Sequence, residues 1–397
     1  MADKNKQGFH TVESNVEEME EKIRIHRKKI VIRGFVLFLI AVISIGSAGI
    51  YFQLKEYSDF EVITEILRSD SEATLYETFA GNVLRYNNDG AFYADMEDNL
   101  IWNQAYEMQN PMVDICENYA AVADRQGTLI YIMNTIGVQG QIETNKPIEA
   151  VCVGNQGIVA ILTQEEGTSY LELYNKGGES VASGEIHIEN SGYPLDIALS
   201  NDANKLAVSI LDISKGKART TVAFYNFGSV GQNEIDNIVS SYTYEDTIIP
   251  EIEFITNDTL IAFGDSRVLL FEGSQRPEEV WKLSLKKEVK SIFYDDSYFG
   301  LIYDKGNGEN TNTMEIYDTK GKLRLEQDFK SNYQQIEFLA NHEICIMADA
   351  FCQIYTLRGI KKFSYTFDMP IHKVLSGKTS RRYTFILDGA MDEVKLK

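Results

Sequence analysis

The sequence has 397 residues, of which 44% are hydrophobic and 24% charged, and its formal net charge is −21. A chain of this length and composition folds around one large or two ordinary cores, and its negative charge argues against binding to nucleic-acid phosphates. Only six prolines and no low-complexity tract argue against long disordered linkers.

An uncharged run near the N-terminus is long enough to cross a membrane. Gly34–Phe52 (GFVLFLIAVISIGSAGIYF) has 19 residues without a charged side chain. At about 1.5 Å per residue, a helix of this length reaches roughly 28 Å, close to a bilayer core. A buried core helix and a cleaved signal peptide are the alternatives. The preceding segment and the run are both longer than in a typical signal peptide, so the sequence predicts an uncleaved signal anchor over 34–52.

Basic residues flank this run unequally. Two follow it as far as residue 68, whereas six lie within the twelve residues before it: Lys22, Arg24, Arg27, Lys28, Lys29 and Arg33. The positive-inside rule therefore predicts a single-pass protein of the cell membrane with a cytoplasmic N-terminus and an extracytoplasmic C-terminal region.

The predicted cytoplasmic tail, residues 1–33, contains a short helical pattern. Its apolar seam follows the 4-3-4-3-4 spacing of a coiled coil through Val12, Val16, Met19, Ile23, His26 and Ile30. Ser44 and Ala48 add a small-xxx-small pair within the predicted span. A homodimer through the N-terminal and transmembrane helices is therefore one hypothesis for this region.

Beyond the span, the chain repeats a strand that ends in an aromatic residue and leads into a glycine turn, as in NTMEIYDTKGKL (Asn312–Leu323). Alternating apolar residues are typical of a half-buried strand. Glycine allows the positive φ of a turn, which we expect at Gly177, Gly228 and Gly321. The aromatic position falls at Tyr93, Tyr131, Tyr174, Tyr225, Phe271, Tyr317 and Tyr355, and Val394 occupies it in the last unit.

Successive aromatic positions lie 38 to 51 residues apart, which is the repeat length of a four-stranded propeller blade. Each unit also contains an inner strand such as MVDICENY and a second apolar strand such as GIVAILTQ. The two tryptophans fall in outer strands, NLIWNQAYEM and EEVWKLSL. The fold class is therefore all-β, a β-propeller after one transmembrane helix. Eight blades fit best, and seven is the alternative if the first unit is incomplete.

The last unit stops after its third strand. An open blade would expose a sheet edge, and propellers commonly close by borrowing a strand from the other terminus. Asp59–Leu67 (DFEVITEIL) is the candidate closing strand. The predicted domains are a cytoplasmic tail over 1–33, the span over 34–52, a juxtamembrane segment with the closing strand over 53–80, and the propeller over 81–397.

Two resemblances follow from these motifs. DGAFYADMEDNLIW resembles quinoprotein-type repeats, and LSNDANKLAVS resembles WD40-like repeats. The whole layout, with VAFYNFGSVGQNEIDNIVSSYTYEDTIIPEIEF (Val222–Phe254), resembles a bacterial family, mainly Gram-positive, that is catalogued as a domain of unknown function. The resemblance implies a membrane-anchored propeller-like domain and brings no catalytic residues.

The chemistry-bearing residues do not form a recognisable motif, so the sequence predicts no catalytic residue, cofactor or metal. The histidines lack metal-ligand spacing, and acidic turns such as YDDS (Tyr294–Ser297) lack a spaced set of calcium ligands. Cys116 and Cys152 are expected to be small core residues. If Ala348-Asp349 forms a two-residue turn, Cys345 lies opposite Cys352, where a disulfide is an alternative to two free thiols.

One insertion stands out as a recognition candidate. Gly228–Asn237 (GSVGQNEIDN) extends the longest repeat with polar residues, and loops on a rigid frame often bind partners. A solvated insertion or short helix is the alternative. The partner-binding candidates are Gln232, Asn233, Glu234 and Asp236.

The sequence therefore favours a membrane-anchored binding or scaffolding module that contacts proteins or other components of the cell envelope. A sensor that passes ectodomain binding to a cytoplasmic partner is one alternative. A quinoprotein-like enzyme is the other alternative. Its active site would need convergent charged residues and a metal, and the sequence indicates neither.

Overall fold

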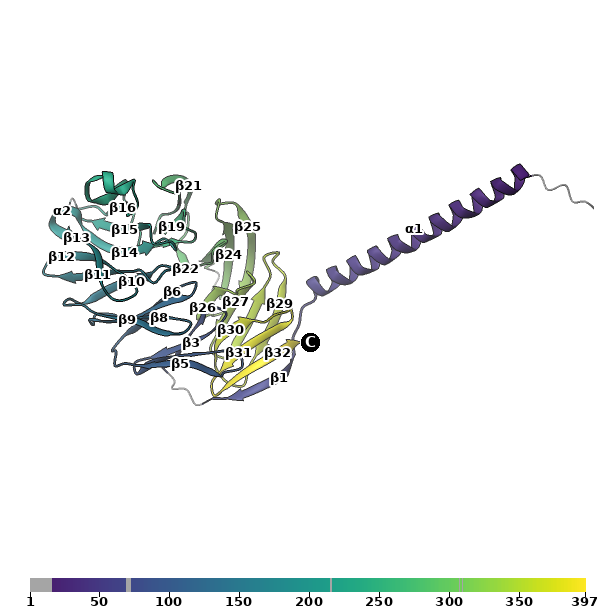
Figure 1. Ribbon diagram of the computed structural model, residues 1–397, viewed down its shortest axis with the longest axis horizontal. Coiled ribbons are helices and arrows are strands. Elements are labelled where there is room, and N and C mark those ends of the chain that lie inside the picture. The colour runs from purple at the N-terminus through teal and green to yellow at the C-terminus, as the bar shows by residue number, and fades with distance from the viewer. Residues whose placement is uncertain (1–15, 69–72, 215, 307, 309) are drawn as a thin grey trace, which may run out of the picture. The chain divides into compact units, whose positions relative to one another are not determined.

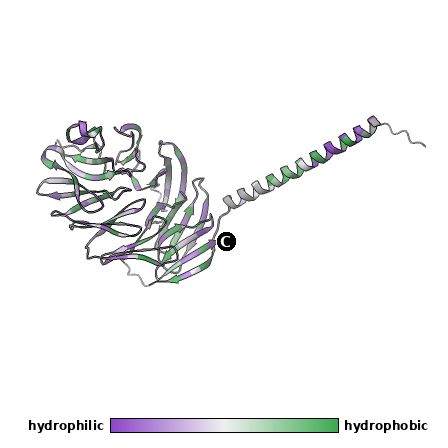
Figure 2. Ribbon diagram, in the orientation of Figure 1, coloured by the Kyte–Doolittle hydropathy of each residue, from purple (hydrophilic) through white to green (hydrophobic). Residues whose placement is uncertain are grey.

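The computed structural model describes residues 16–68, 73–214, 216–306, 308 and 310–397. The chain divides into two compact units, residues 1–55 and 56–397. The first unit contains one continuous helix, α1 (Val16–Leu54), in which a polar first part leads into a hydrophobic part (Figure 2). Val12, the first position of the predicted coiled-coil seam, lies outside the described residues.

The predicted span over 34–52 lies within α1. No helix among the described residues has a stretch that is long and apolar enough to cross a membrane. The side chains at positions 45, 48–50 and 52 of the predicted span lie outside the described part of the structure. The signal anchor therefore stays a prediction.

The second unit consists of eight four-stranded antiparallel sheets, arranged as the blades of a ring (Figure 1). Blade 1 contains β2 (Leu75–Phe79), β3 (Asn82–Asn87), β4 (Gly90–Ala94) and β5 (Leu100–Ala105), and blade 2 contains β6 (Pro111–Cys116), β7 (Tyr119–Asp124), β8 (Leu129–Asn134) and β9 (Gly137–Glu143). Blade 3 contains β10 (Ile148–Val153), β11 (Val159–Glu165), β12 (Thr168–Tyr174) and β13 (Ser180–His187), and blade 4 contains β14 (Tyr193–Leu199), β15 (Lys205–Asp212), β16 (Arg219–Asn226) and β17 (Ile238–Glu245). A one-turn helix, α2 (Ile188–Ser191), connects blades 3 and 4.

Blades 5 to 8 complete the ring. Blade 5 contains β18 (Glu251–Phe254), β19 (Thr259–Phe263), β20 (Arg267–Glu272) and β21 (Glu278–Ser284), and blade 6 contains β22 (Val289–Tyr294), β23 (Tyr298–Asp304), β24 (Thr311–Asp318) and β25 (Leu323–Lys330). Blade 7 contains β26 (Gln335–Phe338), β27 (Ile344–Ala348), β28 (Phe351–Tyr355) and β29 (Lys361–Thr366), and blade 8 contains β30 (Ile371–Ser376), β31 (Arg382–Leu387), β32 (Ala390–Leu396) and β1 (Phe60–Leu67). The predictions of a propeller and of eight blades are confirmed. The first blade begins at Leu75, within the segment 53–80 that the sequence assigned to the juxtamembrane region.

The N-terminal strand closes the ring, as predicted. β1 pairs with β32 in antiparallel register from Phe60 opposite Leu396 to Leu67 opposite Ala390. The ring of Phe60 packs against four aromatic side chains of blades 7 and 8, Phe363, Tyr365, Phe367 and Phe385. Closure therefore removes a sheet edge and adds an aromatic cluster to the core of the last two blades.

A capped turn explains why the aromatic strand recurs. After Tyr317, the Asp318 carboxylate accepts hydrogen bonds from the Lys320 and Lys322 N–H groups at 3.0 and 2.9 Å, and Gly321 has φ of 72°. Asn175 begins a turn of the same kind, in which Gly178 has φ of 82°. The left-handed position is thus the third residue after the capping side chain, where a residue without Cβ is favoured.

This turn geometry corrects two of the three glycine predictions. Gly321 has the expected positive φ, but Gly177 does not, because it is only the second residue after the Asn175 cap. Gly228 also lacks a positive φ, since the chain leaves the hairpin there for a longer insertion. A Cβ on Gly321 would meet the Trp281 indole at 2.3 Å, so this glycine also permits close packing between neighbouring blades.

The turn between Cys345 and Cys352 lies one residue later than predicted. Ala348 pairs with Phe351, so the turn is Asp349-Ala350, and Cys352 lies opposite Met347 rather than Cys345. The two Sγ atoms are 3.7 Å apart, well beyond the roughly 2.05 Å of a disulfide. Both cysteines are free thiols buried in the core. Cys116 also packs in a core cluster, and Cys152 lies at the edge of another, as predicted.

Candidate functional site

The predicted recognition loop, Gly228–Asn237, connects β16 to β17 through two short 3-10 turns, η1 (Gly231–Asn233) and η2 (Ile235–Asn237). Near its start, the loop passes so close to the end of β16 that only glycine fits at position 231. A Cβ on Gly231 would lie 1.6 Å from the Asn226 carbonyl oxygen. The Asn233 amide donates to the Ser229 carbonyl oxygen at 2.8 Å. The insertion is therefore a structured loop on blade 4 that is held by hydrogen bonds within itself.

The four candidate residues of this loop have different environments. Gln232, Asn233 and Asp236 are exposed, but the Glu234 carboxylate is half-buried and forms an ion pair with Arg276 of blade 5. Asp236 lines a groove of about 690 Å³ between blades 3 and 4. The structure thus leaves three candidates accessible to a partner, whereas Glu234 joins two blades.

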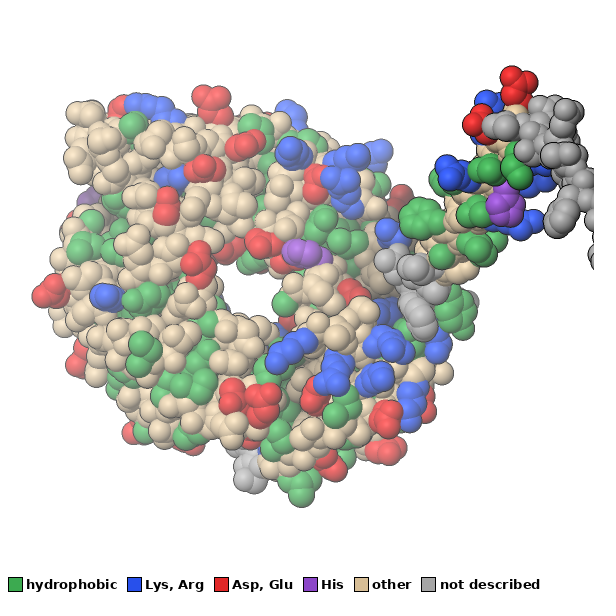
Figure 3. Space-filling view, turned by 45° about the vertical axis from the view of Figure 1, so that its right-hand side comes forward, with side chains coloured by type: hydrophobic (Ala, Val, Ile, Leu, Met, Phe, Trp, Pro, Cys, Tyr) green, Lys and Arg blue, Asp and Glu red, His purple; other side chains and the backbone are tan. Residues whose placement is uncertain are grey.

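The ring has an open axial channel with acidic side chains around its mouth (Figure 3). The last residues of the inner strands and the turns that follow them line the channel, so side chains from successive blades surround one axis. One cavity of about 270 Å³ is lined by blades 2 to 6, and a second of about 410 Å³ by blades 1, 6, 7 and 8. Asp295 and Asp296 of blade 6 line both cavities.

Four carboxylates gather on the side of the channel formed by blades 2, 4 and 5. Burial raises the pKa of Asp114 to about 6 and that of Asp196 to about 7. The Asp114 carboxylate accepts a hydrogen bond from the Val153 N–H of blade 3 at 2.6 Å, and Asp196 accepts one from the Ile252 N–H of blade 5 at 2.8 Å. These bonds lower the pKa of each carboxyl but do not offset burial.

The other two carboxylates, Glu251 and Glu253, lie on β18. Burial is the main cause that raises the pKa of both side chains. For Glu253, the charges of Asp114 and Asp196 raise the pKa further, while a hydrogen bond from Tyr294 lowers it. We call the four residues Asp114, Asp196, Glu251 and Glu253 the acidic cluster; it favours protons or positively charged groups on this side of the channel.

A buried lysine neutralises the opposite side. Lys373 of blade 8 is 5% exposed, and its Nζ lies 2.7 Å from Glu337 of blade 7 and 2.9 Å from Glu77 of blade 1. Burial lowers the pKa of this lysine, but the two carboxylates together raise it above its usual value. The trio joins the last two blades to the first, and we call it the closing trio.

A third group lies where the two cavities meet. Asp295 and Asp296 follow β22, and His342 lies in the turn after β26. The His342 Nδ1 is 2.6 Å from the Asp295 Oδ2, and one ligand atom from each of the three residues lies within 4.8 Å of the others. An imidazole and two carboxylates can together hold a metal ion.

Sequence reasoning named part of this channel and missed the rest. The YDDS turn was singled out, but His342 lies 47 residues beyond Asp295, too far for a short ligand motif. The signal was the repeat itself, because 47 residues is about one blade and equivalent turns of neighbouring blades are adjacent. None of the loop candidates Gln232, Asn233, Glu234 and Asp236 is among the residues that line the two axial cavities.

Comparison with known proteins identifies a family and a fold. Residues 53–396 match a family described as a family of unknown function, DUF5711. No curated protein matches the sequence.

Solved structures share the architecture at low sequence identity. BamB from Moraxella catarrhalis is 13% identical, with a TM-score of 0.50 over 85% of this chain and 100% of BamB. The C-terminal WD40 domain of Sif2 is 12% identical, with a TM-score of 0.57 over 86% of this chain and 100% of that domain. At these identities, the similarity extends to the fold alone.

Proposed function

Because the chain belongs to DUF5711, a family of unknown function, we propose its function from its own structure. It is a membrane-anchored binding or scaffolding protein, with the propeller on the extracytoplasmic side of the cell membrane and with protein or other envelope components as partners. The uncharged run over 34–52 and the excess of basic residues before it support the anchor and its orientation.

One observation carries the scaffold role: the segment that follows α1 is built into the ring. Only residues 55–59 separate α1 from β1. Within this connection, Tyr57 is 1% exposed and bridges Phe363 of blade 7, and the Glu56 carboxylate lies 2.8 Å from the Lys361 Nζ. The propeller is thus a closed frame whose point of attachment is part of its core. Its loops and channel mouth can recognise a partner without the frame being rearranged.

The same connection favours the sensor as a second candidate. α1 is continuous from Val16 to Leu54 and leads within a few residues into the strand that closes the ring. A change in the packing of β1 on ligand binding would have a short covalent path to the N-terminal segment, and a cytoplasmic partner would be needed to receive it.

Cysteine labelling in intact, wall-stripped cells tests the topology. Lys176 is exposed in the turn after β12, and Glu17 is exposed near the start of α1. A membrane-impermeant maleimide should label Lys176→Cys before lysis and Glu17→Cys only after lysis, and the wild type reports the background from the native thiols. Labelling of Glu17→Cys alone in intact cells would contradict the proposed orientation.

Crosslinking in intact cells tests the binding role. Substitution of Gln232, Asn233 and Asp236 by alanine should weaken the capture of a specific partner and leave folding intact, because these side chains are exposed. Adding Glu234→Ala completes the candidate set and also removes an interblade ion pair. If the folded triple and quadruple variants both retain every partner, the interface lies elsewhere on the ring.

A further inference from the structure

Asp295, Asp296 and His342 form a compact triad at the mouth of the axial channel, with one ligand atom from each within 4.8 Å of the others. We propose that this triad binds a divalent transition-metal ion such as Zn²⁺. The ligand chemistry of the triad does not depend on which partner the propeller binds.

The fold holds the Asp295 carboxylate in place. Its Oδ1 accepts hydrogen bonds from the Ser297 and Tyr298 N–H groups at 2.8 and 2.7 Å. These bonds fix the side chain in the turn after β22 and direct Oδ2 towards His342. The Ser297 hydroxyl, in turn, donates to the neighbouring Asp296 at 2.8 Å. Hydrogen-bonded carboxylates of this kind are typical of metal sites, where outer partners orient the ligands.

The imidazole comes from the next blade and is held independently. His342 has φ of 60° in the turn after β26, and its N–H donates to the Leu339 carbonyl oxygen at 2.8 Å. Its ring packs edge-on against Tyr298, with 5.4 Å between ring centroids. Because two different blades supply the ligands, the spacing of the triad is set by the packing of blade 6 against blade 7.

An ion fits this arrangement with a small adjustment. The Nδ1 of His342 and the Oδ2 of Asp295 are 2.6 Å apart, a hydrogen-bond distance. Zinc–nitrogen and zinc–oxygen bonds are about 2.0–2.2 Å, so two ligands of one tetrahedral ion lie roughly 3.3–3.5 Å apart. A rotation of the exposed Asp296 and a modest shift of the imidazole would replace the shared proton by the ion.

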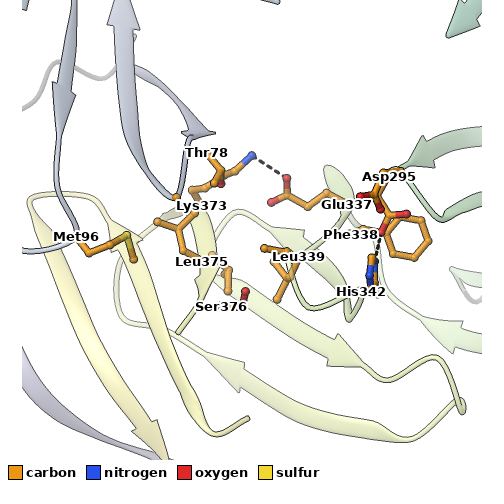
Figure 4. Close-up of a pocket in the computed structure, with 14 residues that line it drawn as sticks. Thr78, Met96, Asp295, Glu337, Phe338, Leu339, His342, Lys373, Leu375 and Ser376 are labelled. Atoms are coloured by element: carbon orange, nitrogen blue, oxygen red, sulfur yellow. Dashed lines mark hydrogen bonds and ion pairs between the residues drawn. The ribbon is translucent and has the colours of Figure 1, made fainter. Parts of the chain in front are cut away.

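The surroundings of the triad leave the ion accessible. Asp295 and Asp296 line both axial cavities, and His342 lines the larger one. In the same cavity, the Glu337 carboxylate is turned towards Lys373, while His342 and Asp295 face each other (Figure 4). Three protein ligands leave at least one coordination position of the ion open, and water can reach it from the cavities.

The ligand chemistry selects the class of metal. Calcium and magnesium prefer sites composed of oxygen ligands, whereas imidazole suits zinc and other transition metals. A nitrogen ligand beside two carboxylates therefore favours Zn²⁺ over Ca²⁺.

Titration of the full-length chain with Zn²⁺ tests the proposal by calorimetry, with Ca²⁺ as the competing ion. Wild type should bind Zn²⁺ and melt at a higher temperature in its presence. His342→Gln and Asp296→Asn should each weaken this binding at least about 10-fold, the loss expected when a metal site loses a ligand or an orienting partner. Asp296 is exposed, so Asp296→Asn should melt like wild type without metal, which separates a ligand from a structural residue.

His187→Gln is the matched control. The His187 Nε2 lies 3.7 Å from the Glu185 carboxylate, so this substitution breaks a histidine–carboxylate pair outside the triad and should leave Zn²⁺ affinity unchanged. Absorption bands of Co²⁺ bound in place of Zn²⁺ should appear in wild type and His187→Gln and be lost in His342→Gln. Equal Zn²⁺ affinity in wild type and both triad variants would overturn the site, and Ca²⁺ competing as well as Zn²⁺ would overturn the choice of metal.

Discussion

Glu253 of blade 5 and Glu337 of blade 7 occupy the same position in two copies of one repeat. Each is the residue before a phenylalanine that pairs with the start of the second strand: Glu253 pairs with Ile261, and Glu337 with Cys345. Yet Glu337 forms an ion pair with Lys373, whereas Glu253 has the other three carboxylates of the acidic cluster as its charged neighbours. The propeller repeats its backbone, and the charge of the channel changes from one side to the other.

The strand after each glutamate explains the difference. Lys373 of blade 8 and Ser291 of blade 6 are both the first residue after a register shift in the inner strand. The lysine reaches back to Glu337, while the Ser291 hydroxyl lies 2.7 Å from the Tyr333 hydroxyl. At these two positions, one residue of the following blade thus decides whether the inner glutamate is neutralised. The neutralised side is the side where the ring closes.

Removing the closing strand, which lies on the neutralised side of the ring, should have the largest effect on stability. Deletion of Asp59–Leu67 from the full-length chain exposes the edge of β32 and disrupts the Phe60 cluster, so we expect the melting temperature to fall by at least about 10 °C. Replacement of the same segment by a flexible Gly-Ser linker of equal length controls for the connection. A peptide with the sequence of Asp59–Leu67 should restore part of the loss, and unchanged melting of the deletion variant would refute closure by this strand.

Removing the lysine should convert the closing side into a second unpaired side. Lys373→Met leaves the Glu337 and Glu77 carboxylates without their cation, and we expect a loss of about 3 kcal/mol in the free energy of unfolding, as for other buried ion pairs. Lys361→Met is the control, because the Lys361–Glu56 pair is more exposed and should contribute less than about 1 kcal/mol. Equal effects of the two substitutions would show that burial of the trio does not matter.

The fold could be predicted from the sequence, but the arrangement of charged residues in the channel could not. Aromatic residues such as Tyr174 and Tyr317 recur because every blade needs a buried third strand and a capped turn, so the number of blades and the closing strand could be predicted. The closing trio could not, because Glu77, Glu337 and Lys373 come from three blades and share no local pattern. The disulfide hypothesis for Cys345 and Cys352 was wrong because the turn between them lies one residue later than expected.

The acidic cluster should make stability depend on pH. The folded-state pKa values of Asp114 and Asp196 are about 6 and 7, above the usual value of about 3.9 for the unfolded chain. The folded state therefore binds more protons between pH 4 and 7, and the stabilisation present at low pH is lost as pH rises through 6 to 7. Because both side chains are only partly buried, we expect a loss on the order of 1–2 kcal/mol between pH 5 and 8.

Asp196→Asn checks this origin, since its amide oxygen can still accept the Ile252 N–H. Denaturant unfolding from pH 5 to 8 should give a smaller slope for this variant than for wild type. Identical slopes would place the pH dependence outside the acidic cluster.

One measurement tests the central contrast most directly: the same substitution at the two equivalent glutamates, compared by denaturant unfolding of the full-length chain at pH 8. Glu253→Gln removes a charge that burial and neighbouring carboxylates disfavour and keeps an acceptor for Tyr294, so it should stabilise the protein by about 1 kcal/mol. Glu337→Gln takes a partner from Lys373 and should destabilise it by about 1–2 kcal/mol. Opposite signs are the predicted result. If both variants shift stability in the same direction, the two sides of the channel do not differ in charge pairing, and the account is wrong.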